Sequence, residues 1–205
     1  MNNHSSCRVR GFVSLVLLLV VAACAETQPS RFYMLSGMGA PMSEAVDEGE
    51  RELVIGLGPI TLPQYLNRPQ IVMRTSPNKL ELAEFDKWAE PLDDLFSRVV
   101  AENVSALLAT RHVVIVPQRR SRRTDYQVQI DVMQFDTEVS GMTVLVARWS
   151  VFSGRGDEPL ATQISKISNS ITDPSDYESV VAAMSQALGT LSRAVATAIR
   201  SESSS

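Results

Sequence analysis

Two sets of side chains in this sequence have the types that acid–base chemistry requires. His112 is the only histidine after residue 23, and as a general base for a serine it would need a carboxylate partner to hold it. It follows a predicted helix, so a histidine that meets the exposed carbonyls of a helix end explains it better. Asp131, Asp136 and Glu138 lie along one predicted strand, where alternation sends Asp131 to the opposite face from the other two unless a bulge intervenes. We therefore interpret these carboxylates as parts of solvated strand faces and predict no catalytic residue and no enzyme activity.

The first 24 residues have the pattern of an export signal that ends in a modifiable thiol. Arg8 and Arg10 precede an apolar run from Phe12 to Val21, and small residues then lead into Cys24. This order is typical of a secretory signal peptide, and the run is shorter than the about 20 residues of a membrane span. Val21-Ala22-Ala23-Cys24 resembles the bacterial lipobox, in which the cysteine is acylated and becomes the new N-terminus. The alternative is a soluble secreted protein that is cut near Ala23.

We predict a signal peptide over residues 1–23, a lipidated tether over 24–30 and attachment to the membrane through Cys24. Each buried methylene adds about 0.8 kcal/mol of membrane affinity, and the several acyl chains of a bacterial lipoprotein make the attachment permanent. Ala25 stands where enterobacterial lipoproteins that stay at the inner membrane carry Asp, which favours the periplasmic face of the outer membrane. Six extended residues reach only ~20 Å, so the folded part must lie close to the membrane.

Cofactor and metal sites have little support in the mature sequence. With Cys7 removed and Cys24 acylated, no thiol remains for a disulfide, a thiolate metal site or a nucleophile. One histidine and no thiol leave only hard oxygen sites for a metal. Gly56-Leu57-Gly58 is spaced like part of a nucleotide loop, but Pro59 follows where a helix should begin, so a glycine bulge is favoured. We predict no cofactor and no metal site.

The composition favours one folded domain with no affinity for nucleic acid. Removing Arg8 and Arg10 from the 19 Lys and Arg leaves 17, against 23 Asp and Glu, so the mature chain is mildly acidic. We predict a single domain over residues 31–200 and a disordered tail over 201–205. The basic cluster Arg119-Arg120-Ser121-Arg122-Arg123 is either a solvated loop or a patch for anionic lipid headgroups or an acidic partner.

Hydrophobic periodicity predicts two helices and a set of strands. Apolar residues at helical spacing run from Leu92 to Leu108, interrupted only by Asn103, and a second helix follows a capping signature at 173–176 and continues to Ile199. Strands are expected over 31–35, 53–57, 71–75, 79–82, 113–116 (short and buried), 126–132, 143–152 and 160–171 (with a bulge near Lys166). These elements predict an α+β fold with two amphipathic helices packed on one face of a largely antiparallel β-sheet.

The segment from Leu62 to Pro69 is the strongest candidate for contact with a partner. Its two prolines prevent a regular strand and hold the residues between them in a stiff turn. Tyr65, Leu66 and Arg68 then have the composition of an interaction hot spot, formed either with a second copy of the chain or with another subunit. The alternative is that Tyr65 and Leu66 cover an edge of the core.

Several segments of the mature chain together resemble one family of bacterial lipoproteins. They are Ile55–Val72, Phe85–Leu92, Asp125-Tyr126 leading into Phe135-Asp136, and Ala147-Arg148-Trp149. These segments resemble the PqiC/YmbA family, also called ABC-type transport auxiliary lipoproteins. The loop from Ser36 to Arg51 carries none of this signature.

The resemblance implies a non-enzymatic envelope component that works with an MCE-domain protein. Such systems move lipids between the inner and outer membranes and support outer-membrane integrity. Of the residues with a defined chemical role, the resemblance transfers only Cys24. The leading hypothesis is thus a lipid-anchored docking or assembly subunit. A lipoprotein that carries a lipid or small ligand between its helices is the first alternative, and an envelope hydrolase is a distant one.

Overall fold

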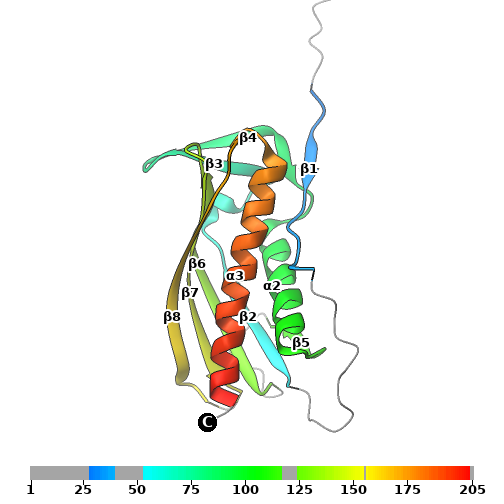
Figure 1. The fold of residues 1–205 in the computed structure, drawn as a ribbon, viewed down its shortest axis with the longest axis vertical. Helices are drawn as coiled ribbons and strands as arrows, with labels where there is room; N and C mark the ends of the chain where they lie inside the picture. The colour runs from blue at the N-terminus through cyan, green and yellow to red at the C-terminus, as the bar shows by residue number, and fades with distance from the viewer. Residues whose placement is uncertain (1–27, 40–52, 117–123, 155, 204–205) are drawn as a thin grey trace, which may run out of the picture.

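The computed structural model describes residues 28–39, 53–116, 124–154 and 156–203. Its elements follow the order strands, helix, strands, helix that the sequence predicts (Figure 1). They are β1 (Arg31–Tyr33), β2 (Ile55–Thr61), the 3-10 turn η1 (Gln64–Leu66), β3 (Gln70–Ser76), β4 (Lys79–Trp88), α2 (Leu92–Leu108), β5 (Val113–Ile115), β6 (Tyr126–Glu138), β7 (Met142–Ser153), β8 (Pro159–Ser170) and α3 (Tyr177–Ser203).

The eight strands form one mixed sheet that branches at β6. One edge of β6 pairs antiparallel with β7 along its whole length, and β7 pairs antiparallel with β8. The other edge of β6 has two parallel neighbours. Its start pairs with β2, and β5 continues this branch beyond β2. Its end pairs with β3, and β4 and then β1 continue that branch. The longest ladders are antiparallel, whereas β1, β2, β3 and β5 each have a parallel neighbour.

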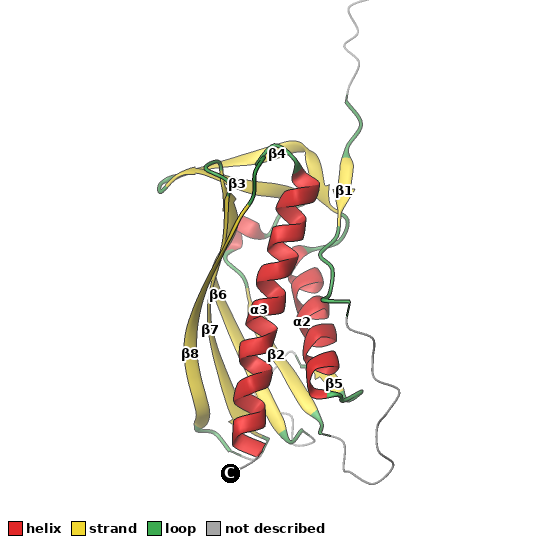
Figure 2. Cartoon of the chain, in the orientation of Figure 1, coloured by secondary structure: helices red, strands yellow, loops and turns green. Residues whose placement is uncertain are grey.

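Both helices lie side by side on one face of this sheet (Figure 2). The apolar stripe of α2 is buried, as are the corresponding residues of α3, and both contribute to one core with the inward face of β6 and β7. Phe96 of α2 meets Phe135 of β6 edge to face, with ring centroids 5.5 Å apart. The predicted α+β class, with its helix pair on one face, is confirmed.

Several predicted boundaries differ from the structure. Strand β5 is not buried: Val114 and Ile115 are 50% and 52% exposed, because β5 pairs only with β2 and ends this branch of the sheet. Helix α3 continues to Ser203, so the first three residues of the predicted tail are helical. The irregularity in β8 lies at its start, opposite Val151 and Phe152, and the ladder is regular at Lys166.

The glycine bulge predicted in β2 is confirmed. The register of β2 against β6 shifts between Leu57 and Ile60. Gly58 has φ +128°, and a Cβ atom there would lie 2.1 Å from the carbonyl oxygen of Val116. Only glycine fits this backbone. The bulge allows Pro59 to lie within β2, away from the regular part of the ladder.

A second bulge, in β6, changes which carboxylates share a face. The register against β7 shifts between Val132 and Gln134, after which the pairing is regular again. Asp131 pairs with Arg148 and Asp136 with Val144, so the two aspartates face the same side of the strand. Asp131 was expected to face away from Asp136 and Glu138 unless a bulge intervened; the bulge is present, and its extra residue shifts the phase of the alternation.

Candidate functional site

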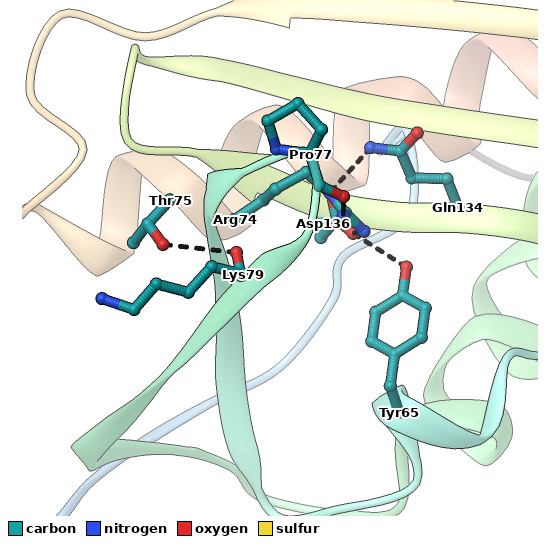
Figure 3. Close-up of polar contacts among 7 residues, drawn as sticks. All are labelled: Tyr65, Arg74, Thr75, Pro77, Lys79, Gln134 and Asp136. Atoms are coloured by element: carbon teal, nitrogen blue, oxygen red, sulfur yellow. Dashed lines mark hydrogen bonds and ion pairs between the residues drawn. The ribbon is translucent and has the colours of Figure 1, made fainter.

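The proline-bounded turn from Leu62 to Pro69 is built over a buried carboxylate. Pro63 precedes η1, whose single turn carries Tyr65 and Leu66, and the chain then enters β3. Asp136 of β6 has a fully buried side chain, and the Tyr65 hydroxyl donates a hydrogen bond to its Oδ2 at 2.8 Å. The turn is thus fastened to the sheet through one phenol (Figure 3).

Arg74 of β3 supplies the charge that balances Asp136. Its Nη2 lies 2.6 Å from Asp136 Oδ2 and its Nε 3.2 Å from Oδ1, so the guanidinium binds the carboxylate through both oxygens (Figure 3). Gln134 Nε2 donates a further hydrogen bond to Oδ1 at 2.8 Å. We call Tyr65, Arg74, Gln134 and Asp136 the Asp136 cluster. A buried carboxylate with a bidentate partner and two more donors is fully satisfied, which its burial requires.

The prediction that these carboxylates lie on solvated strand faces holds for only part of the set. Asp131 is exposed and accepts a hydrogen bond from the Thr61 hydroxyl at 2.7 Å. Half-buried Glu138 accepts one from exposed Ser140 at 3.0 Å. Asp136 is the exception, because η1 and β3 cover it. Each carboxylate has its own hydrogen-bond donor, and this arrangement is structural rather than that of an acid–base pair.

The Asp136 cluster changes the acid–base behaviour of Tyr65. Burial of the ring, followed by the hydrogen bond to Asp136 and the charge of that carboxylate, raises the pKa of Tyr65 from 10.0 to about 12. The protonated phenol is therefore favoured in the folded state. An unfolded chain releases this proton near pH 10 and the folded chain only near pH 12, so the Tyr65 contribution is complete below pH 10 and is lost as pH rises towards 12.

We expect Tyr65→Phe to lower the free energy of unfolding by about 1.5–3 kcal/mol below pH 10, the usual contribution of a hydrogen bond to a charged group. The variant should also lose less stability than the wild type between pH 10 and 12, since it has no phenol at this position to ionise. Urea denaturation across this pH range measures both effects. Tyr126→Phe, which lies outside the Asp136 cluster, is the control. Equal alkaline loss in wild type and Tyr65→Phe would contradict the assignment.

The three residues predicted to bind a partner differ in their exposure. Leu66 is 3% exposed and belongs to the hydrophobic core, so its place in a displayed hot spot is a wrong prediction. Tyr65 is half-buried and directs its hydroxyl inwards to Asp136. Arg68 is exposed, together with Gln64 and Asn67. Of the three, Arg68 is the one whose side chain is available for a partner.

A second buried aspartate holds the N-terminal strand. Asp86 of β4 is 4% exposed, and Arg31 Nε lies 2.7 Å from its Oδ1 while Nη2 donates to Oδ2 at 2.9 Å. The Tyr33 hydroxyl also donates to Oδ1, at 2.8 Å. Burial and these interactions with Asp86 raise the pKa of Tyr33 to about 12. Arg31, Tyr33 and Asp86 form the Asp86 cluster, which repeats the Arg–Asp–Tyr chemistry of the first cluster.

After β1 the chain crosses both helices, and this crossing explains the polar Asn103 in the apolar stripe of α2. Leu35 is 2% exposed and joins the core. The Ser36 amide donates to Ser185 Oγ of α3 at 3.1 Å, and the Met38 amide donates to Asn103 Oδ1 at 2.8 Å. The Met38 side chain packs where α3 has Gly189. The 35–38 segment therefore covers the seam between the two helices. The polar Asn103 in an otherwise apolar stripe was the feature of the sequence that marked this contact.

The remaining candidate groups do not converge on a reactive site. His112 is exposed, four residues beyond the last residue of α2, and its backbone carbonyl accepts a hydrogen bond from Ile55. Among the described residues, no group of three or more His, Cys, Asp or Glu side chains is placed to hold a metal ion. Cys24 and the basic cluster at Arg119–Arg123 lie outside the described residues.

Two clefts lie beside the contacts described above. One, of about 520 Å³, borders the Asp136 cluster at Arg74 and Gln134 and continues past Pro77, Met133 and Glu138. The other, of about 540 Å³, runs along α3 beside the 35–38 segment; Asn169, Ser185, Gln186, Thr190 and Arg193 are among its lining residues. Polar and apolar groups line both, whereas sites for apolar ligands are lined mainly by apolar and aromatic groups. No helix in the described ranges is long and apolar enough to cross a membrane.

Comparison with known proteins gives one family and a shared fold. Residues 33–196 match the model of the family described as ABC-type transport auxiliary lipoprotein component. The intermembrane transport lipoprotein PqiC of Escherichia coli (strain K12) is 23% identical over 135 residues, which span 65% of this chain and 70% of that protein. Its counterpart from Shigella flexneri gives the same values.

Two solved structures share the architecture at low sequence identity. A crystal structure of an uncharacterized protein has a TM-score of 0.67 at 18% identity, over 84% of this chain and 99% of its own. A protein from Xanthomonas campestris has a TM-score of 0.60 at 16% identity, over 87% and 99%. These similarities support the fold of the chain.

Proposed function

This chain belongs to the family of ABC-type transport auxiliary lipoprotein components, and on that premise we propose that it is a lipid-anchored, non-enzymatic subunit of an envelope lipid transport system. The subunit is attached through Cys24 to the periplasmic face of the outer membrane and works with an MCE-domain protein to support outer-membrane integrity. The name of its relatives, intermembrane transport lipoprotein, supports a role between two membranes. Ala25 at the second position of the mature chain supports the outer membrane.

The observation that favours a docking subunit over a lipid carrier is the 35–38 segment. A lipoprotein that carried lipid between its helices would hold an acyl chain between α2 and α3. The 35–38 segment instead crosses that seam: the Ser36 amide bonds to α3, and the Met38 amide bonds to α2 while its side chain packs beside Gly189. The cleft beside it along α3 has a mixed lining with polar groups such as Asn169, Gln186 and Arg193, whereas a site for an acyl chain is lined mainly by apolar groups. The domain therefore contributes surfaces for binding, not an interior for cargo.

We propose that Arg68 is the contact residue of the turn and that Tyr65 is a positioning residue. Tyr65 fixes η1 to Asp136, and Arg68 follows two residues after η1 ends. The Arg68 amide bonds to the Leu66 carbonyl at 2.8 Å, so the backbone that carries the exposed guanidinium is ordered by a buried residue. An exposed arginine on a fixed turn loses little backbone entropy when it binds. The partner is the MCE-domain protein or a second copy of this chain.

Arg68→Glu should weaken assembly by about tenfold or more, equivalent to about 1.4 kcal/mol or more, because the reversed charge opposes the partner surface that arginine fits. The melting temperature should change little, since Arg68 is exposed. Co-purification with the partner and analytical ultracentrifugation measure assembly. Arg148→Glu, the same charge change at an exposed position of β7, is the control. Assembly equal to that of the wild type would exclude Arg68 from the interface.

Native mass spectrometry of the full chain, purified from membranes in detergent, tests the proposed function. We expect a complex with an MCE-domain protein or a defined oligomer, and no lipid beyond the covalent anchor. A stoichiometric, non-covalently bound lipid on the isolated chain would instead favour the carrier. Absence of an MCE-domain protein after mild crosslinking in intact cells would contradict the proposed transport role.

A further inference from the structure

Strand β1 has two chemically different sides. It pairs parallel with β4, with Arg31 opposite Asp86 and Phe32 opposite Lys87, and it ends this branch of the sheet. Arg31 and Tyr33 both bond to buried Asp86, so these alternate residues share the polar side of β1, although the Arg31 side chain remains 62% exposed. The residues between and after them must face the other way.

The outward side of β1 is apolar. Phe32 is 65% exposed and Met34, two residues further on, is 48% exposed. Such side chains are ordinarily scattered singly, and here one lies on the edge strand and the other directly follows it, while Arg31 and Tyr33 bond to Asp86. Lys87 is next to Phe32 in the register, and its Nζ donates to Ser30 at 2.9 Å, which adds a cation beside the aromatic ring. An apolar pair with an adjacent cation matches an anionic bilayer surface.

The chain that precedes β1 limits how far this strand can lie from the bilayer. Phe32 follows Cys24 by eight residues, which span at most about 26–29 Å when fully extended. Helix α3, which runs along the longest axis of the molecule, has 27 residues and is therefore about 40 Å long (Figure 1). β1 lies towards one end of that axis and β5 towards the other (Figure 1). An anchor at Cys24 thus brings the β1 end nearest to the membrane.

We propose that Phe32 and Met34 insert into the boundary between headgroups and acyl chains of the bilayer that holds the anchor. The inference rests on the lipid anchor of the proposed function. Acyl chains alone hold the domain at the surface but leave it free to rotate about the tether. A second apolar contact, rigidly attached to β4 by the Asp86 cluster, fixes the orientation, with β1 on the membrane and β5 directed towards the periplasm.

The test uses one fluorophore at two positions of nearly equal exposure. Because Cys24 is acylated and Cys7 is removed with the signal peptide, an introduced cysteine is the only free thiol of the mature chain. Met34→Cys and Val114→Cys, at side chains that are 48% and 50% exposed, are labelled with bimane in the full-length lipoprotein. The labelled proteins are reconstituted into vesicles of phosphatidylethanolamine and phosphatidylglycerol, with and without brominated lipid.

Brominated lipid should quench the label at residue 34 by about half or more, because an interfacial apolar group lies roughly 5–10 Å into the boundary region. The label at residue 114 should keep its emission. Adding Phe32→Asp to Met34→Cys should reduce the quenching to the level seen at residue 114, while the protein continues to float with the vesicles.

Each other outcome overturns a defined part of the inference. Flotation without quenching at residue 34 shows that the anchor holds but β1 stays off the bilayer. Equal quenching at both positions shows that the domain has no preferred orientation. A blue-shifted emission at residue 34 that bromine leaves unchanged shows that protein covers β1. Loss of flotation in the unmodified chain contradicts the anchor itself, and with it the proposed function.

Discussion

Replacing Arg74 with methionine should lower the free energy of unfolding by about 3–5 kcal/mol, the usual cost of removing one partner from a buried ion pair. Asp136 has no exposed side-chain surface, and Arg74 supplies the two guanidinium contacts that balance its charge. Tyr65 and Gln134 would remain as neutral donors. They do not compensate a full negative charge in the interior, so the folded state must either keep an unpaired carboxylate or bind a proton.

A control pair on the same hairpin separates burial from charge. Lys79 and Glu81 form an ion pair at 2.7 Å, but their side chains are 66% and 55% exposed. Lys79→Met should therefore cost less than about 1 kcal/mol. The double variant Arg74→Met with Asp136→Leu should recover much of the loss from Arg74→Met, because it leaves no charge unpaired. Urea denaturation measures all three variants. Equal losses for Arg74→Met and Lys79→Met would show that the buried pair has no special role.

The Asp136 cluster connects stability with the proposed interface. It joins β6 to η1 and β3, which lie more than 60 residues earlier, at the point where β3 pairs with the end of β6. If the proposed interface is correct, we expect variants of Tyr65 or Arg74 to alter assembly indirectly, through the position of the turn. We expect Arg68 to be the residue at which assembly can be changed while the fold is kept.

Local sequence patterns predicted those elements that depend only on residues close to one another in the sequence. The apolar repeat from Leu92 to Leu108 matches α2, and the neighbouring strands expected over 71–75 and 79–82 match the β3–β4 hairpin. The acidic start of the last helix is also confirmed: Asp176 accepts the Glu178 amide at 3.1 Å and caps α3. Each of these features depends on residues within a few positions of one another.

Features that depend on distant partners were less predictable. The bulge in β6 has no glycine or proline to mark it, and it reverses the face expected for Asp131. The burial of Asp136 depends on η1 and β3, which lie more than 60 residues earlier. Strands β2 and β6 pair in parallel although η1, β3, β4, α2 and β5 lie between them in the sequence, so this pairing joins distant segments. None of these arrangements follows from alternation within one strand.

The candidate site also combines features that could be predicted from local sequence with features that depend on distant residues. Composition identified the turn at 62–69, but it could not separate a displayed leucine from a core one, and Leu66 proved to be core. Asn103 was visible as a polar interruption in an apolar stripe, yet its partner, the Met38 amide, lies in a loop 65 residues away. Cys24 is different, because its chemistry depends on the sequence around it alone.

Cys24→Ala should abolish acylation and the anchoring of a mature protein to the outer membrane. The thiol is the acceptor of the lipid in the proposed pathway, and no helix of the described chain provides an alternative span. One acyl chain gives only reversible binding, whereas several chains hold a protein permanently, so their loss changes the distribution completely. The variant should be found as uncleaved precursor or as soluble periplasmic protein. Metabolic labelling with a radioactive fatty acid, followed by membrane fractionation, measures both properties.

Cys7→Ala is the matched control, since Cys7 lies in the predicted signal peptide and should be absent from the mature protein. That variant should incorporate fatty acid and fractionate with the outer membrane, as the wild type does. Fatty acid on Cys24→Ala would refute the lipoprotein assignment, and wild-type protein in the inner membrane would refute the interpretation of Ala25. The exposed pair Phe32 and Met34 cannot rescue Cys24→Ala, because two side chains provide far less buried apolar surface than the acyl chains of the anchor.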